Sequence, residues 1–268
     1  MLDDLTMLPS EIKGILEQYG VTPTKAKGQN FLMDERVAER EVDYLDLDPR
    51  DTVLEVGPGL GILTDILLER AERVIAIELD RGMAEYSRNR YGDSIVFIEG
   101  DALKIPFPGF DRFISNIPYS ISSPLIFKLL EHRFRKAVVM VQREFADRMV
   151  ASPGTGDYSR LSVNMYYRAE CEILEKVPKS RFWPEPEVDS AVVSIIPRRP
   201  PFRVVDEEFY LNLVNSLFQH RRKKIRTILK MKKLVDKDRL SSLPFLDERV
   251  EVLSPEEIGE LSDAILSP

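Results

Sequence analysis

The chain has 268 residues, 43% hydrophobic and 31% charged, which suits one large domain or a large domain with a small one. A single cysteine, Cys171, excludes a disulfide framework, and one cysteine with two histidines leaves no His/Cys cluster, so no metal site is expected. The net charge is −7. No apolar run approaches the ~18 residues that span a bilayer, and the acidic start lacks the apolar core of a signal peptide. We therefore expect a cytoplasmic protein without a membrane partner.

The first half of the chain predicts two helices and then a regular alternation of strands and helices. Residues 9–19 and the stretch after GQNFL (28–32) have helical patterns. Short β-branched runs separated by helical stretches follow, which is typical of a doubly wound, mostly parallel, Rossmann-like α/β sheet. The expected strands are 53–56, 74–79, 95–99, 111–115 and 137–141, and the clearest helices are 62–70 and 81–91.

The pattern changes after residue 141. Two runs, 171–177 and 190–196, flank the connection PKSRFWPEPEVD and predict an antiparallel hairpin added to the sheet. The proline-rich PRRPP that follows marks a boundary, and 206–235 and 254–266 have helical patterns. We therefore expect an α/β domain over 1–198, including an N-terminal extension over 1–27, and a small all-helical domain over 199–268.

A glycine-rich turn, LEVGPGLGILT, follows the first expected strand. Its glycines, Gly57, Gly59 and Gly61, permit a sharp turn and close approach of a ligand at the head of a helix. The spacing is G-x-G-x-G rather than the dinucleotide G-x-G-x-x-G, and the loop has no basic residue or Walker lysine for phosphates. The loop therefore predicts an adenosine cofactor without phosphates, namely S-adenosylmethionine (SAM).

Acidic residues end the strands around this loop. Glu78 ends the second strand, where a carboxylate accepts hydrogen bonds from ribose hydroxyls. Asp101 follows the third strand and is placed to accept from the adenine amino group, with Ala102 as apolar cover. Glu55, just before the loop, is placed to meet the positively charged methionine end of SAM.

The sequence Asn-Ile-Pro-Tyr follows the fourth expected strand. These residues are ordinary in turns, but their place at the same sheet edge as the acids indicates a pocket. The exocyclic amine of adenine is a poor nucleophile, and two acceptors, the Asn116 side-chain oxygen and the Ile117 carbonyl, would stabilise the charge that develops on it. Pro118 fixes the chain direction and Tyr119 would stack on the base. Phe182 is expected over the second face of the base, with core packing as the alternative.

Six motifs, in order, resemble those of the ribosomal RNA adenine dimethyltransferases, over about residues 20–233. The resemblance, closest to the archaeal and eukaryotic small-subunit branch, implies a SAM-dependent methyltransferase domain and a small helical RNA-contacting domain. It also implies dimethylation of two adjacent adenines near the 3′ end of small-subunit rRNA during ribosome biogenesis. The motifs are GQNFL (28–32), LEVGPGLGILT (54–64), AIELD (76–80), EGDAL (99–103), NIPYSISSPLIFKLL (116–130) and FWPEPEVDSAVVSI (182–195).

The resemblance adds site residues by matching position. It places Asn30 and Leu32 against SAM and Gln29 at the border of the same pocket. The cofactor-binding residues expected in total are Gln29, Asn30, Leu32, Gly57, Gly59, Glu78, Asp101, Ala102 and Asn116. The expected catalytic residues are Asn116, Ile117, Pro118, Tyr119 and Phe182.

A basic segment at residues 219–233 contrasts with the negative net charge: QHRRKKIRTILKMKK has eight Lys or Arg and no acid. Such a run is either a solvated helix face or the place where a phosphate backbone binds. The resemblance favours RNA contact, by Arg221, Arg222, Lys223 and Lys224. The expected partner is small-subunit rRNA or the pre-small ribosomal subunit, bound by a monomer.

Three other functions stay open at this point. Large-subunit rRNA adenine methyltransferases can also carry Asn-Ile-Pro-Tyr. Some relatives in the superfamily bind SAM and RNA mainly in ribosome assembly or transcription, with catalysis secondary. A nicotinamide cofactor for hydride transfer ranks last, because it would leave the Asn-Ile-Pro-Tyr motif and the basic segment without a role.

Overall fold

A computed structural model describes residues 6–23 and 29–267, so the expected N-terminal extension and GQNFL lie partly outside the described residues. The chain forms two compact units, Met1–Ala146 with Glu172–Pro197 and Asp147–Cys171 with Arg198–Pro268. The expected boundary at 198 put residues 147–171 in the first domain. They pack in the second unit because Val163 and Tyr167 are buried in its core.

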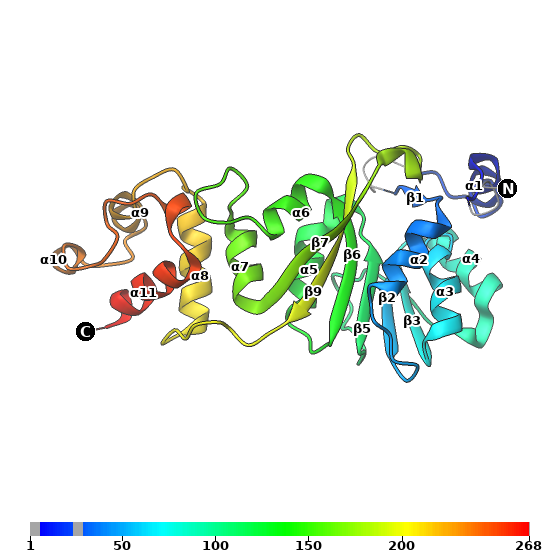
Figure 1. Ribbon diagram of the computed structural model, residues 1–268, viewed down its shortest axis with the longest axis horizontal. Helices are drawn as coiled ribbons and strands as arrows, with labels where there is room; N and C mark the ends of the chain where they lie inside the picture. The colour runs from blue at the N-terminus through cyan, green and yellow to red at the C-terminus, as the bar shows by residue number, and fades with distance from the viewer. Residues whose placement is uncertain (1–5, 24–28, 268) are drawn as a thin grey trace. The chain divides into compact units, whose positions relative to one another are not determined.

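The first unit is built on a seven-stranded sheet in the order β4-β3-β2-β5-β6-β9-β7 (Figure 1). Strands β2 to β6 are parallel, and β9 runs antiparallel to β6. The expected doubly wound α/β class with an antiparallel addition is confirmed. The strands are β2 Thr52–Val56, β3 Arg73–Glu78, β4 Val96–Glu99, β5 Arg112–Asn116, β6 Lys136–Gln142, β7 Ala169–Val177 and β9 Ser190–Pro197.

The strand order reverses between β2 and β5. Strands β3 and β4 lie on one side of β2, while β5 and β6 lie on the other. In open parallel sheets, the carboxyl ends of the strands at such a reversal border the ligand crevice. The helices of this unit are α1 Pro9–Gln18, α2 Glu35–Asp43, α3 Ile62–Arg70, α4 Arg81–Tyr91 and α5 Ser122–Leu129; α6 Arg143–Met149 begins in this unit and ends in the second.

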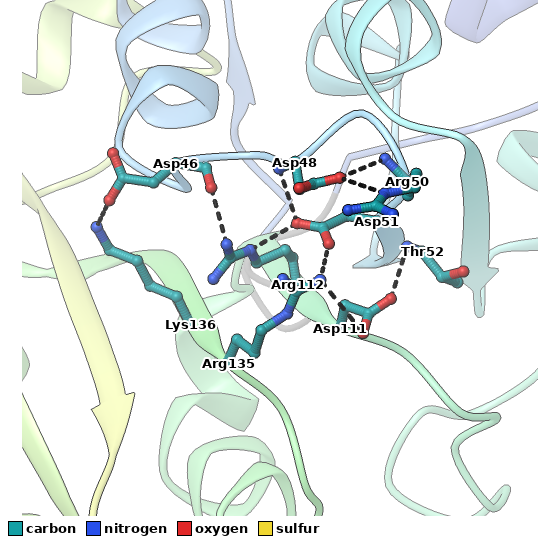
Figure 2. A network of polar contacts seen from close by, with 9 residues as sticks. All are labelled: Asp46, Asp48, Arg50, Asp51, Thr52, Asp111, Arg112, Arg135 and Lys136. Carbon is teal, nitrogen blue, oxygen red and sulfur yellow. Dashed lines mark hydrogen bonds and ion pairs between the residues drawn. The ribbon is translucent and has the colours of Figure 1, made fainter.

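An ion network lies at the amino ends of the parallel strands, on the side of the sheet away from the crevice. It is centred on Asp51, a fully buried carboxylate (Figure 2). Arg112 Nε donates to Asp51 Oδ2 at 2.8 Å, and Arg135 contacts Asp51 Oδ1. The Thr52 amide donates to Asp111 Oδ2 at 3.0 Å. These bonds join the starting ends of β2 and β5, so the network fixes the sheet from the edge that does not face the crevice.

The N-terminal segment is tied to this unit in two ways. Strand β1 (Phe31–Leu32) pairs antiparallel with β8 (Phe182–Trp183), with Leu32 opposite Phe182. Helix α1 buries Ile12 and Leu16 in a small cluster with Leu60 and Met83. Two motifs about 150 residues apart in the sequence, GQNFL and FWPEPEVDSAVVSI, are therefore brought together by β1 and β8.

The second unit is helical. Its core joins the buried faces of its helices, and Tyr158 and Tyr210 donate their hydroxyls to the carbonyls of Leu253 and Pro255, at 2.8 and 3.3 Å. The expected helix over 206–235 is interrupted at 219–224, where the chain turns. Among the described residues, no helix has the length and hydrophobicity to cross a membrane. The helices are α7 Arg160–Arg168, α8 Glu207–Phe218, α9 Ile225–Lys232, α10 Lys237–Leu240 and α11 Pro255–Leu266.

Candidate active site

A cavity of about 850 Å³ opens at the carboxyl ends of the parallel strands. This volume lies in the range of small-molecule and cofactor sites. Its walls come from the glycine loop, the ends of β3 and β5, and the segment after β4. All nine residues expected to bind the cofactor line it: Gln29, Asn30, Leu32, Gly57, Gly59, Glu78, Asp101, Ala102 and Asn116.

The glycine loop adopts a backbone that requires its glycines. Gly57, Gly59 and Gly61 have φ values of 74°, 53° and 88°, in the left-handed region. At Gly61, a Cβ atom would lie 1.8 Å from the hydroxyl oxygen of Tyr91, which donates to Asp65 Oδ1 at 2.8 Å. The third glycine therefore serves helix packing as well as the turn.

Glu78 fixes the loop from the end of β3. Its Oε1 accepts from the Asp80 amide at 2.8 Å, and its Oε2 accepts from the Gly59 amide at 3.4 Å. The side chain is 8% exposed, and burial raises its pKa. Each carboxylate oxygen has a further lone pair, so Glu78 can hold the loop and still accept from ribose hydroxyls.

Glu55 is a second buried acid in the cavity wall. Its residue exposure is 1%, and Thr64 Oγ1 donates to its Oε2 at 2.7 Å. Burial raises the pKa of this carboxyl to about 8, and the Thr64 bond opposes the shift. Glu55 is therefore mainly protonated at neutral pH, and a cation placed beside it would favour its charged form.

Two hydrogen bonds fix the segment after β4, one within the segment and one from α5. Asp101 Oδ1 accepts from the Leu103 amide at 2.9 Å, and this bond is the main reason that the pKa of Asp101 is lowered. Lys128 on α5 donates to the Ala102 carbonyl at 2.7 Å. Asp101 thus remains an ionised acceptor at the rim where the adenine amino group is expected.

The charge of the cavity fits a cationic adenosine cofactor. Five acidic side chains line it, and Arg81 is the one basic residue among its described lining residues. The buried oxygens Gln29 Oε1 and Asn116 Oδ1 make no hydrogen bond to the described part of the chain. Buried polar atoms of this kind are normally paired, so a ligand with donors suits the site. The residues present therefore fit SAM, which carries a sulfonium and an ammonium, better than a phosphate-bearing nucleotide.

The Asn-Ile-Pro-Tyr residues lie where β5 ends. Asn116 and Pro118 line the cavity, while Ile117 and Tyr119 lie outside its lining. The Ile117 amide donates to the Met140 carbonyl at 3.0 Å, which fixes the chain direction. The Tyr119 hydroxyl lies 2.8 Å from Ser190 Oγ, and burial is the main cause that raises the pKa of this phenol.

Phe182 is not brought to the cavity. The side chain is 5% exposed and belongs to the core that contains Leu32 and Val177. Trp183, its neighbour, packs in the small N-terminal cluster, as core packing predicts. The expectation that Phe182 covers a target base stays a prediction.

Sequence reasoning missed Tyr19 and Gly20 as wall residues of the cavity. The segment passes close to α4: a Cβ atom on Gly82 would lie 2.4 Å from both the Tyr19 carbonyl oxygen and Val21 Cγ2. No local pattern marks Tyr19, because its place depends on the docking of α1 against residues more than 40 positions away.

Some side chains of the basic segment bind other parts of the protein, and others are exposed, with no such contact to the described part of the chain. Arg221 donates to the carbonyls of Gly156 and Tyr158 at 2.8 and 2.9 Å. Lys224 lies 3.5 Å from Asp247. Arg222 and Lys223 are exposed in the turn before α9, rather than on a helix face.

The family model described as ribosomal RNA adenine dimethylase matches residues 22–263. A probable ribosomal RNA small subunit methyltransferase A of Methanosarcina mazei is 45% identical over 267 residues, covering 95% of this chain and 97% of that protein. The crystal structure of a dimethyladenosine transferase from Plasmodium falciparum has a TM-score of 0.74 and 32% identity, over 86% of this chain and 95% of that one. The 23S rRNA methyltransferase ErmE has a TM-score of 0.68 and 30% identity, over 89% of this chain and all of that one.

Proposed function

The chain belongs to the ribosomal RNA adenine dimethylase family, and from this premise we propose its substrate and the roles of its residues. The enzyme is a SAM-dependent rRNA adenine dimethyltransferase of the small-subunit type. Its proposed targets are two adjacent adenines near the 3′ end of small-subunit rRNA, methylated on the exocyclic amine. We also propose a cytoplasmic monomer that acts on rRNA or the pre-small subunit.

The cofactor residues hold and orient the methyl donor. When bound, SAM supplies an electrophilic methyl group on a positively charged sulfur. Glu78 is proposed to accept from the ribose and Asp101 from the adenine of the cofactor, and Glu55 is proposed to lie beside its cationic end. Gln29 and Asn30, which precede β1, and Leu32 on β1 form part of the cavity wall.

The target base is proposed to enter beside Asn116. The side-chain oxygen of Asn116 and the Ile117 carbonyl would accept the two hydrogens of the amine, which concentrates the nitrogen lone pair toward the methyl group. Tyr119 would stack on the base, with its phenol held by Ser190. No strongly basic group is required, because the proton can leave after the methyl transfer.

One observation supports this role most directly. Asn116 Oδ1 lies at the wall of the cavity that the nine cofactor residues share, and it has no hydrogen-bond partner among the residues described. An unpaired buried acceptor costs free energy that an incoming amine would recover. This unpaired oxygen supports the proposed role of Asn116 as an acceptor for an N–H group of the reacting amine.

The test is incubation of the protein and SAM with small- and large-subunit rRNA, followed by mass spectrometry of both. We expect dimethyladenine at two adjacent positions of small-subunit rRNA, and a rate lower by ~10²-fold or more for Asn116→Ala with RNA affinity little changed. Methylation confined to large-subunit rRNA would reverse the substrate assignment, and a near-normal rate for Asn116→Ala would remove the acceptor role.

A further inference from the structure

Helix α1 packs against residues that line the cofactor cavity. Its buried side chains, Ile12 and Leu16, lie in the small N-terminal cluster with Leu60 and Met83. Leu60 belongs to the glycine loop and Met83 to α4, and both line the cavity. A helix of 10 residues is marginally stable in water by itself, so α1 depends on this packing. The docking of α1 and the shape of the cavity wall are therefore linked.

The end of α1 forms part of that wall. Gly20 has a φ of 65°, its amide donates to the Glu17 carbonyl at 3.2 Å, and the Val21 amide donates to the Leu16 carbonyl at 2.8 Å. These two bonds make a Schellman motif, which returns Val21 onto Leu16 in the same apolar cluster. Tyr19 and Gly20, which we call the α1 corner, line the cavity. Hydrogen bonds at the end of α1 therefore fix the corner in place.

Tyr19 contacts α4 and, through it, the glycine loop. Its ring lies edge-on to Tyr86 with the ring centres 5.4 Å apart, and its hydroxyl accepts from Asn89 Nδ2 at 3.4 Å. Tyr86 donates its own hydroxyl to the Leu60 carbonyl at 3.3 Å. Gly82 permits the close approach, because a Cβ atom there would lie 2.4 Å from the Tyr19 carbonyl oxygen. The corner thus rests on two elements that shape the cavity.

A series of contacts joins the α1 corner to Glu78. Glu78 Oε1 accepts from the Asp80 amide at 2.8 Å, and Asp80 Oδ1 accepts from the Gly82 amide at 3.0 Å. Gly82 is the residue that the Tyr19 carbonyl approaches. The corner therefore lies on the side of the cavity where Glu78 is proposed to accept from the ribose. A wall at this side excludes water, which strengthens the hydrogen bonds made there.

We propose that the α1 corner is a further cofactor-binding element: it covers the ribose side of SAM, and the docking of α1 and the binding of SAM stabilise each other. The inference rests on the proposed cofactor site around Glu78. A ligand stabilises the state that binds it more tightly, and this coupling is reciprocal. The protein with α1 docked has the complete wall, so it binds SAM more tightly, and SAM in turn holds α1 in place.

Calorimetry with SAM alone tests the contribution of the Tyr19 ring. Tyr19→Ala removes the aromatic contact with Tyr86 and should weaken SAM binding by about threefold to tenfold. Tyr19→Phe keeps the ring and loses only the long bond from Asn89, so SAM affinity should stay within about twofold of the wild type. This pair of variants distinguishes the covering ring from the hydroxyl.

A second pair of variants tests the docking of α1. Leu16→Ala removes the side chain that holds α1 in the cluster and should weaken SAM binding by about fivefold or more. Leu45→Ala is the matched control, because Leu45 is similarly buried but lies in the main core of the first unit and outside the cavity lining. It should lower the melting temperature and keep the wild-type affinity for SAM. If Leu16→Ala fails to fold, the Tyr19 pair decides the question.

Hydrogen exchange and fluorescence follow α1 directly. Addition of SAM to the wild type should slow exchange of the α1 amides by about threefold or more, relative to those of α11 in the second unit. Trp183, the single tryptophan, packs in the N-terminal cluster, and Lys13 Nζ on α1 lies 5.7 Å from the centre of its ring. Its emission should move to longer wavelength in Leu16→Ala and move back when SAM is added.

Wild-type SAM affinity in Tyr19→Ala, or exchange of α1 that SAM leaves unaltered, would overturn the proposal. These measurements contain no RNA, so they decide the role of the corner even if the protein transfers no methyl group to rRNA. Glu78→Ala separates the inference from the cofactor site on which it rests. Weaker binding in Tyr19→Ala with wild-type affinity in Glu78→Ala would keep the corner and reject Glu78, and the reverse pattern would reject the corner alone.

Discussion

The hydroxyl of Tyr119 lies 2.8 Å from Ser190 Oγ, a hydrogen bond between residues 71 positions apart. Tyr119 follows β5, and Ser190 is the fully buried first residue of β9, the strand that runs antiparallel to β6. Strand β9 therefore contributes a side chain to the region after β5 in addition to extending the sheet. It supplies the group that fixes the phenol proposed to stack on the target base.

Removing this bond should slow catalysis without affecting the cofactor. In Ser190→Ala, the phenol loses a hydrogen bond worth about 1 kcal/mol, which corresponds to about a fivefold fall in kcat/KM for RNA. SAM affinity, measured by calorimetry, should stay unchanged because neither residue lines the cofactor cavity. Ser190→Thr keeps the hydroxyl and is the rescue variant; a Ser190→Ala enzyme with wild-type kcat/KM would separate the phenol from substrate binding.

Glu78→Ala should weaken SAM binding by about 1–3 kcal/mol, the cost of losing bonds to a buried partner. Part of the loss comes from the Gly59 amide, which Glu78 holds in the loop. The matched control is Glu99→Ala, since Glu99 is the paired residue on β4, is exposed and faces Arg88 instead of the cavity. Calorimetry that gives both variants the wild-type affinity would exclude Glu78 from the cofactor site.

The raised pKa of Glu55 should appear in the pH dependence of stability. The carboxyl has a pKa of about 8 in the folded chain and an ordinary value of 4.5, so the folded state binds more protons between these pH values. This contribution to stability is fully present below pH 4.5 and is lost as the pH rises toward about 8. Chemical unfolding should show a smaller decline over that interval for Glu55→Gln than for the wild type.

The same group should couple SAM binding to proton release. A cation beside Glu55 favours its charged form, so binding at pH 7 should release part of a proton. Calorimetry in buffers of different ionisation enthalpy measures this number directly. Glu55→Gln should release less; an equal release in both proteins would assign the proton to another group.

Of the four residues of the basic segment that are expected to contact RNA, we predict that Arg222 and Lys223 bind it. Reversing the exposed pair, Arg222→Glu with Lys223→Glu, should weaken rRNA binding and flatten its salt dependence by about one to two counterions. Arg221→Ala should instead lower the stability of the second unit, because its guanidinium holds the carbonyls of Gly156 and Tyr158. An unaltered salt slope after the double reversal would make the segment a solvated surface.

Much of this protein follows from local sequence. The expected helices at 62–70 and 81–91 match α3 and α4 at both ends. Their starts are set locally, by a glycine with positive φ before α3 and by the capping Asp80 before α4. The alternation of strands and helices gave the fold class, and the carboxyl-end rule for parallel sheets brought Glu78, Asp101 and Asn116 to one edge. Short-range patterns are sufficient here because each depends on residues within one element or one turn.

Other features were decided by tertiary structure alone. The sequence gives no sign that Tyr19 lines the cofactor cavity, that Arg221 donates to the carbonyls of Gly156 and Tyr158, or that Glu41 is fully buried. For Phe182 it left core packing only as the alternative, and the side chain is buried in the core. It also places 147–171 in the wrong compact unit. Each of these depends on contacts between distant segments, and a charged residue in a helical pattern reads as exposed until its neighbours are known. Local periodicity determines the elements, whereas burial and partner choice arise only when those elements pack.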